Sequence, residues 1–255
     1  VGSEMCIRDR FLAGFVDSIA GGGGLISLPA YILAGLTPHM ALGTNKFSSS
    51  MGTTIATIRF ALNGFIRIRL AIICIIGALI GSTIGSHLAL MLSDKIVTHM
   101  MIVVLPLVAF YVLRDKKLGQ IPSSQEPEPG PKTPFICGIT ALIIGCYDGF
   151  YGPGTGTFLL LILTGWAKLG IRTAAGLTKA TNLSSNIAAL VTFLISGNVY
   201  FPLAIAGAIA NIAGNYIGAG MVMSNANRIV RPIIVIVLTP VSYTHLRAHE
   251  TDQYL

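Results

Sequence analysis

The chain contains eight long apolar stretches, separated by short polar connections. Most of them reach the roughly 20 residues that an α-helix needs to cross a bilayer. Because lipid offers the backbone no hydrogen-bond partners, such stretches must form helices. The sequence therefore predicts an all-α polytopic membrane protein, with apolar stretches at 11–36, 41–62, 70–92, 96–113, 134–165, 174–197, 199–223 and 229–239.

The composition agrees with a membrane protein and argues against a soluble domain and against a nucleic-acid-binding protein. Hydrophobic residues make up 53% of the chain and charged residues only 11%, against about 25% charged residues in soluble domains. The net charge is +7, but no basic cluster is interleaved with aromatic residues, so we expect no nucleic-acid partner. The four cysteines have no metal-ligand spacing, and we expect neither a metal nor another cofactor.

Both ends of the chain differ sharply from their apolar neighbours. Residues 1–10 (VGSEMCIRDR) and 241–255 (VSYTHLRAHETDQYL) resemble translated adapter sequence. We interpret both as non-native tails and exclude them from the expected fold.

A polar, proline-rich segment, residues 114–133, divides the remainder into two parts of similar length. Residues 41–85 match residues 174–218 at a constant spacing, and four of the six glycines between 41 and 92 have a counterpart. Such self-similarity indicates two repeats, residues 11–113 and 134–240, joined by a cytoplasmic linker. The matched pairs are Gly14/Gly145, Asp17/Asp148, Gly21/Gly152, Gly23/Gly154, Ala41/Ala174, Gly43/Gly176, Lys46/Lys179, Phe60/Phe193, Gly64/Gly197, Gly81/Gly214 and Gly85/Gly218.

The basic residues predict the topology, because cytoplasmic loops of membrane proteins are rich in lysine and arginine. If the first apolar stretch of each repeat is a re-entrant hairpin broken by glycines, three crossings remain in each half. The two repeats are then inverted in the membrane, and only Lys95 faces outward. Eight full crossings remain the alternative. The cytoplasmic set would be Arg67, Arg69, Arg114, Lys116, Lys117, Lys132, Lys168, Arg172, Arg228 and Arg231.

Two glycine runs stand at membrane depth, in DSIAGGGGLISLP (17–29) and DGFYGPGTGTFLL (148–160). Glycine runs break helices, and a broken backbone at this depth must be buried in protein or line a wet cavity. The N-terminus of a half-helix offers N–H groups to an anion. A tight packing notch is the alternative function of these glycines. The expected anion-binding glycines are Gly21, Gly22, Gly23, Gly24, Gly152, Gly154 and Gly156.

Polar side chains and one lysine lie in each matched segment GTNKFSSSMG (43–52) and LTKATNLSSN (177–186). A lysine in the membrane costs at least ~2.5 kcal/mol, so Lys46 and Lys179 should face a cavity or a carboxylate. Asp17 and Asp148 are the expected partners, with a structural or coupling role. The bridges could be purely structural, or the segments could also bind an anion, through Thr44, Asn45, Lys46, Ser49, Thr178, Lys179, Asn182 and Ser185.

These residues resemble the sulfite exporter TauE/SafE (TSUP) family of membrane permeases. The resemblance covers residues 11–239 and rests on GFVDSIAGGGGLISLPAYILAGLTPHMALGTNKFSSSMGT (14–53), TKATNLSSNIAALVTFLISGNV (178–199) and GAIANIAGNYIGAGM (207–221). The second glycine run, GPGTG, departs from the regular glycine triplet of the family. The resemblance implies transport of sulfite, sulfonates or related small organosulfur anions across the inner membrane.

We therefore expect a multi-pass permease of the cell inner membrane that works by alternating access. Its partners would be the lipid bilayer, a small anionic substrate and a coupling ion, H⁺ or Na⁺. Two other classes remain open. An intramembrane enzyme is disfavoured because no nucleophile motif is present, and a non-transporting membrane subunit would need a larger complex.

Overall fold

The computed structural model describes residues 2–100, 103 and 129–224, and all regular structure within them is helical. Stretch 229–239, most of stretch 96–113, most of linker 114–133 and tail 241–255 lie outside these residues. The labelled helices are α1 (Gly2–Ala20), α2 (Gly24–Leu33), α3 (Pro38–Leu62), α4 (Ile68–Met91), α6 (Thr133–Phe150), α7 (Thr155–Gly165) and α8 (Ile171–Ile195). A further long helix runs over Phe201–Ser224.

The first apolar stretch of each half is divided into two helices, as the glycine runs predict. Helix α1 ends at Ala20 and α2 begins at Gly24, while α6 ends at Phe150 and α7 begins at Thr155. The backbone turns left-handed at Gly21 (φ +73°), Gly152 (φ +100°) and Gly154 (φ +80°). Such φ values suit glycine and end a helix. With 10 and 11 residues, α2 and α7 are too short to cross a bilayer.

Helix lengths recur in the same order in both halves. Helices α3 and α8 have 25 residues each, and α4 and Phe201–Ser224 have 24 each. The first helices of the two halves, α1 and α6, have 19 and 18 residues. This succession agrees with a duplicated chain, and the inverted orientation of the two halves stays a prediction.

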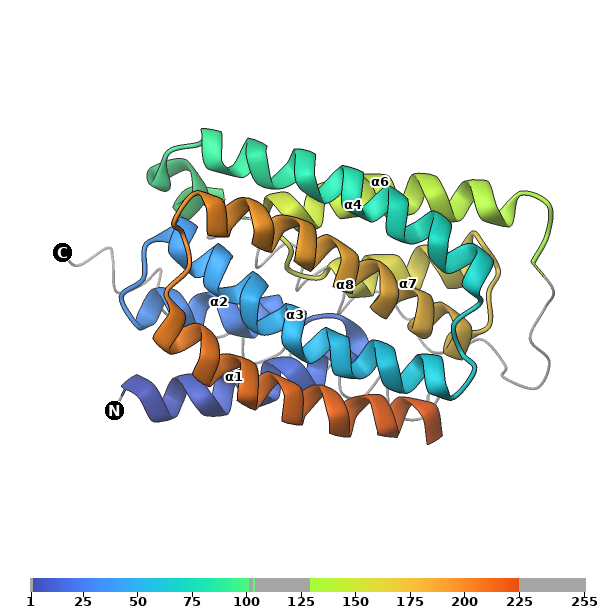
Figure 1. Ribbon diagram of the computed structural model, residues 1–255, viewed down its shortest axis with the longest axis horizontal. Coiled ribbons are helices and arrows are strands. Elements are labelled where there is room, and N and C mark those ends of the chain that lie inside the picture. The colour runs from blue at the N-terminus through green and yellow to red at the C-terminus, as the bar shows by residue number, and fades with distance from the viewer. Residues whose placement is uncertain (1, 101–102, 104–128, 225–255) are drawn as a thin grey trace.

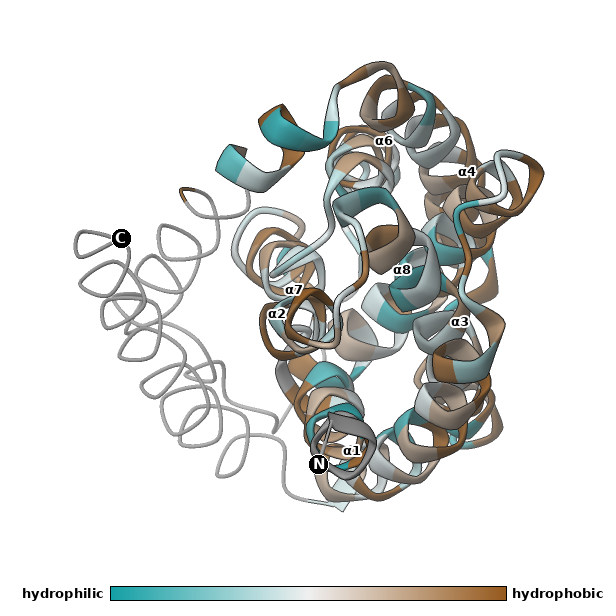
Figure 2. Cartoon of the chain, turned by 90° about the vertical axis from the view of Figure 1, so that its left-hand side faces the viewer, coloured by the Kyte–Doolittle hydropathy of each residue, from teal (hydrophilic) through white to brown (hydrophobic). Residues whose placement is uncertain are grey.

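The bundle is apolar on its outer face, and its interior holds many polar side chains beside a buried apolar core. On α4 the side chains of Ile72, Ile76, Ile80 and Ile84 are each at least half exposed, and this spacing places them on one face. Helix α8 instead lies inside, against α3, α4, α6 and α7 (Figure 2). Among the described helices, α4, α6 and Phe201–Ser224 are long and apolar enough to cross a membrane.

Basic residues gather at one end of the bundle. The α3–α4 loop, the α7–α8 loop and the start of α6 meet there, on the right of Figure 1. The Thr133 hydroxyl donates to the carbonyl of Ala167 (3.4 Å), and the Arg172 guanidinium lies 5.6 Å from the centre of the Phe65 ring. The loops and the helix start that meet here carry Arg67, Arg69, Lys132, Lys168 and Arg172, whereas Lys95 follows the other end of α4.

In each half, the helix that follows the 25-residue helix packs against the first helix of the other half. A Cβ added to Gly81 on α4 would lie 2.1 Å from the carbonyl oxygen of Leu142 on α6. At the matched position, a Cβ on Gly214 would lie 2.2 Å from the carbonyl oxygen of Phe11 on α1. Matched glycines therefore make matched contacts, and the two halves interlock. The number of full crossings, six or eight, stays a prediction, because α6 is long enough to span a membrane without α7.

Candidate functional site

The tips of the two hairpins touch each other. A Cβ on Gly21 would lie 2.2 Å from the Cα of Gly156, and a Cβ on Gly156 would lie 2.5 Å from the Cα of Gly21. A Cβ on Gly24 would lie 3.1 Å from the Cα of Pro153. Only glycine permits such backbone contact. Close packing thus accounts for Gly21, Gly24 and Gly156, while their anion-binding role stays a prediction.

Two buried ion pairs flank the meeting point of the tips, and they cross between the halves. Lys46 on α3 places its Nζ 3.0 Å from Asp148 Oδ1 on α6. Lys179 on α8 places its Nζ 2.9 Å from Asp17 Oδ2 on α1. The expected carboxylate partners are therefore present, and each lysine binds the hairpin of the opposite half. Such pairing is what permits a charged lysine to be buried.

The Lys46–Asp148 pair has further hydrogen-bond partners. The Thr155 hydroxyl donates to Asp148 Oδ1 (2.9 Å), and the Ser185 hydroxyl donates to Asp148 Oδ2. Lys46 Nζ also donates to Asn186 Oδ1 (3.0 Å). The side chains of Lys46 and Asp148 are only 2% and 4% exposed, so this pair is fully enclosed and saturated.

The Lys179–Asp17 pair has fewer partners. Lys179 also donates to the backbone oxygen of Asp17, which accepts the Gly21 N–H as well (2.8 Å). Within the described part of the chain, no second side chain donates to the Asp17 carboxylate. The side chain of Asp17 is 15% exposed. This pair is thus less enclosed than its counterpart.

Other predicted site residues hold neighbouring segments together. The Asn45 Oδ1 accepts from the hydroxyls of Ser27 (2.7 Å) and Ser49 (3.4 Å), which ties α3 to α2. The Thr44 hydroxyl accepts the N–H of Tyr200 (3.0 Å) at the start of the last described helix. These contacts give Thr44, Asn45 and Ser49 structural partners, and the ion pairs do not include them.

The remaining predicted residues lie around the tips and on α8. Gly154 precedes the first residue of α7, and a Cβ on Gly23 would lie 2.7 Å from the Cβ of Asp17. A Cβ on Gly22 would lie at ordinary van der Waals distances from nearby side chains. Asn182 is buried on α8, and the buried Thr178 hydroxyl has no partner among the described residues. A binding role for these residues stays a prediction.

Sequence reasoning missed two direct partners of the ion pairs, Thr155 and Asn186. Asn186 could have been found, because residues 179, 182 and 186 recur at helical spacing on one face of α8. Thr155 gave no such signal, since only the turn at Gly152–Gly154 brings its hydroxyl back to Asp148. Arg10, in the predicted foreign tail, donates to Asn45 Oδ1 and Ser48 Oγ (3.0 Å each).

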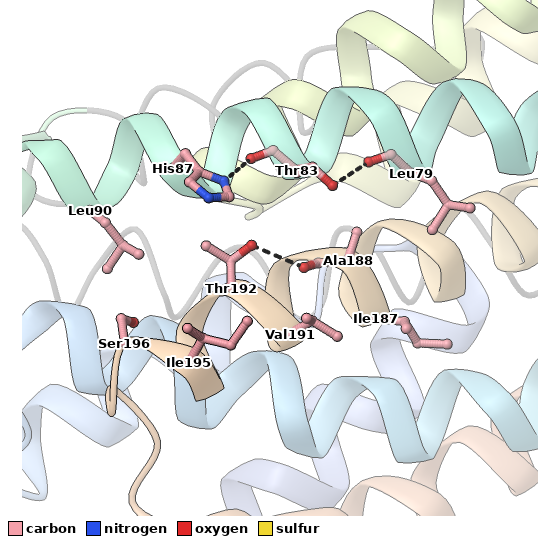
Figure 3. Close-up of a pocket in the computed structure, with 10 residues that line it drawn as sticks. All are labelled: Leu79, Thr83, His87, Leu90, Ile187, Ala188, Val191, Thr192, Ile195 and Ser196. Atoms are coloured by element: carbon pink, nitrogen blue, oxygen red, sulfur yellow. Dashed lines mark hydrogen bonds between the residues drawn. The ribbon is translucent and has the colours of Figure 1, made fainter.

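A separate cavity of about 440 Å³ lies between α4 and α8, away from the ion pairs. Leu79, Leu90, Val191 and Ile195 supply much of its wall, and the Nδ1 of His87 donates to the backbone carbonyl of Thr83 (2.8 Å; Figure 3). None of the predicted site residues lines it. Its apolar wall does not suit an anion.

The comparisons with known proteins agree with the resemblance found in the sequence. The family model described as sulfite exporter TauE/SafE matches residues 10–244. "Probable membrane transporter protein ORF9" of Sinorhizobium sp is 32% identical over 89% of this chain and 85% of the relative. Similar proteins in Haemophilus influenzae (a "probable membrane transporter protein") and Escherichia coli K12 ("probable membrane transporter protein YfcA") are each 32% identical over 89% of this chain, covering 87% and 82% of the relatives.

No solved structure matches the chain. The family match spans nearly its whole length, and the three relatives are named as membrane transporter proteins. The chain therefore belongs to the sulfite exporter TauE/SafE family of membrane transporter proteins.

Proposed function

We propose that this protein is a multi-pass permease of the inner membrane that carries a small anion by alternating access. The proposed substrate class is sulfite, a sulfonate or a related organosulfur anion. The observation that carries the proposal is the pair of crossed bridges, Lys46–Asp148 and Lys179–Asp17, at the point where two broken hairpins meet.

The electrostatics of this point favour an anion. Helices α2 and α7 both begin at the touching tips, and a helix N-terminus carries a partial positive charge. Two lysines lie beside these N-termini, inside a bundle whose outer face is apolar. In such surroundings of low dielectric constant, positive groups act on an anion more strongly than they do in water.

The geometry also supports movement between two states. The hairpins enter the bundle from opposite ends (Figure 1), as two inverted repeats would. Their tips meet through glycine backbone, with no side chains between Gly21 and Gly156 that would interlock. Because each lysine binds the other half's hairpin, a rocking of one half would move both hairpins and open the site to alternate sides.

Flux measurements in proteoliposomes test the proposal. The protein would be tested for uptake and efflux of labelled sulfite, sulfate, thiosulfate and taurine. Saturable movement of one of them would support the permease and identify its substrate. If a well-folded protein moves none of them, the permease proposal fails for this substrate class, and a subunit role becomes the better explanation.

A charge-neutral pair of variants tests the site itself. Replacing a lysine together with its partner, as K46Q/D148N or K179Q/D17N, avoids leaving one buried charge unpaired. Each double variant should lose at least about tenfold in transport, because an anion then meets no positive side chain at that bridge. H39Q/D94N is the matched control, since it removes a hydrogen-bonded His–Asp pair (2.5 Å) away from the two bridges. Unchanged flux in both double variants would place the anion path elsewhere.

A further inference from the structure

The charge balance of the two bridges limits how an anion can bind. Lys46 and Lys179 each face one carboxylate at 3.0 and 2.9 Å, so the four buried groups together carry no net charge when all are ionised. An anion bound between these four groups would leave them with one net negative charge, which is costly at membrane depth. The buried Arg10 on α1 is a further positive group, and it donates to Asn45 and Ser48. A cation that travels with the anion removes the cost at the bridge itself, and a proton on a carboxylate adds the least volume to a packed site.

We propose that Asp17 binds a coupling proton, and that the protein carries its anion together with that proton. This inference rests on the proposed function and names its coupling ion. A proton from water adds to the Asp17 carboxylate and releases the Lys179 ammonium, which then holds the anion. On the other side of the membrane the anion leaves, Asp17 gives its proton to water, and the Lys179–Asp17 bridge re-forms.

Net charge is conserved through this cycle. The empty bridge consists of one carboxylate and one ammonium, and the loaded one of a neutral acid, an ammonium and a monovalent anion. Both sum to zero, so neither the empty nor the loaded protein carries net charge through the membrane at this bridge. Lys179 also stays anchored when Asp17 is protonated, because it donates to the backbone oxygen of the same residue.

The contacts favour Asp17 over Asp148 for this role. Protonation of Asp148 would disturb three donors, Lys46, Thr155 and Ser185. Protonation of Asp17 disturbs Lys179 alone among the described side chains. Asp17 is also more exposed, 15% against 4%, which gives water a route to it.

The elements around Asp17 carry few other charged or titratable groups in the described residues. Its own helix α1 carries the buried Arg10 two turns before it, which donates to Asn45 and Ser48. Helix α8 contributes Lys179, and the lysine of α3, Lys46, binds Asp148 instead. Helix α7 has no titratable side chain, and α2 contributes only Tyr31. The tyrosine of the last described helix, Tyr216, packs against Arg59 (4.1 Å). The pH response is therefore assigned to the Lys179–Asp17 pair.

The test follows a labelled sulfonate, methanesulfonate, into proteoliposomes that contain a trapped pH dye. Sulfonates stay ionised in the neutral pH range, so any dependence on pH belongs to the protein. We expect an acidic outside to drive uptake, with about one proton entering per anion and with little effect of an imposed membrane potential. Uptake that follows the potential and moves no protons would overturn the proposal and leave the permease function intact.

The variant D17N locates the proton. Its empty bridge would keep the positive charge of Lys179, so the protein could exchange one anion for another but could not return empty. We expect net uptake to fall at least about tenfold, and to fall more than anion exchange does. D17E should keep proton-coupled uptake, and D94N is the control. Proton-driven accumulation that survives in D17N would overturn the assignment.

Two further results have to be considered, a D17N variant that does not fold and an unmodified protein that moves no anion. If D17N does not fold, the proton-to-anion ratio and the response to potential of the unmodified protein still decide the proposal. If the unmodified protein neither exchanges nor accumulates methanesulfonate or any anion of the panel, the proposed function fails, and this inference fails with it.

Discussion

The two ion pairs occupy matched positions in the two halves, yet their surroundings differ. Lys46–Asp148 is enclosed and receives hydrogen bonds from Thr155 and Ser185. Lys179–Asp17 is more open, and the positions that match Thr155 and Ser185 are Gly24 and Gly52. Duplication of the sequence pattern therefore did not duplicate the chemistry of the pair.

The space around Gly52, the position that matches Ser185, shows why no hydroxyl-bearing side chain fits there. A Cβ on Gly52 would lie 1.9 Å from Asn211 Oδ1 and 2.6 Å from Asn215 Nδ2. The matched positions on α4 hold the smaller Ala78 and Ser82, and the Ser82 hydroxyl donates to the carbonyl of Ser185. Gly52 on α3 thus faces the larger Asn211 and Asn215 of the last described helix. At the matched place, Ser185 on α8 faces the smaller Ser82 of α4. This reversal of residue size leaves the Asp148 bridge with a serine hydroxyl and the Asp17 bridge without one.

The largest expected difference between the pairs is in stability. Asp148→Asn leaves Lys46 charged and buried without its partner, and breaking a buried pair in this way costs about 3–5 kcal/mol. Asp17→Asn should cost less, about 2 kcal/mol, because Lys179 keeps a backbone acceptor and is less enclosed. Thermal unfolding in detergent and the amount of protein inserted in the membrane measure both. Equal losses, or a larger loss for Asp17→Asn, would contradict the comparison, and Asp94→Asn serves as the exposed control.

The sequence predicted the participants of the site better than their arrangement. The pairing of lysines with Asp17 and Asp148 followed from the cost of buried charge, and the helix breaks followed from the glycine runs. The crossing of the pairs between halves could not be predicted, because matched positions allow either partner. The difference between the pairs was equally hidden, since it depends on how the last described helix, with Asn211 and Asn215, packs on α3.

A substitution at Gly52 tests whether packing alone excludes the hydroxyl beside Asp17. Gly52→Ser should destabilise the protein by about 1–3 kcal/mol, because the new side chain overlaps Asn211 and Asn215. Adding Asn211→Ala and Asn215→Ser, the residues of the matched helix, should recover most of this loss. The unfolding temperature in detergent is the measurement.

The control for this series is Gly165→Ser. An added Cβ there meets nothing within 4 Å, so we expect a change within about 0.5 kcal/mol. If Gly52→Ser is as mild as Gly165→Ser, or if the triple variant is no more stable than the single one, the size reversal does not explain the difference between the pairs.

The smallest expected effect comes from making the enclosed pair resemble the open one. Thr155→Val keeps the shape of the side chain and removes the donor to Asp148 Oδ1, which should cost about 1 kcal/mol. Thr164→Val is the matched control on the same helix, because the Thr164 hydroxyl donates only to backbone carbonyls of its own helix and its loss should change stability little. In the Thr155→Val background, Asp148→Asn should then cost less than it does alone, since one donor to the carboxylate is already gone. If the two substitutions instead add without any coupling, the Thr155 hydroxyl does not support the Asp148 charge, and the contrast between the two bridges must come from burial alone.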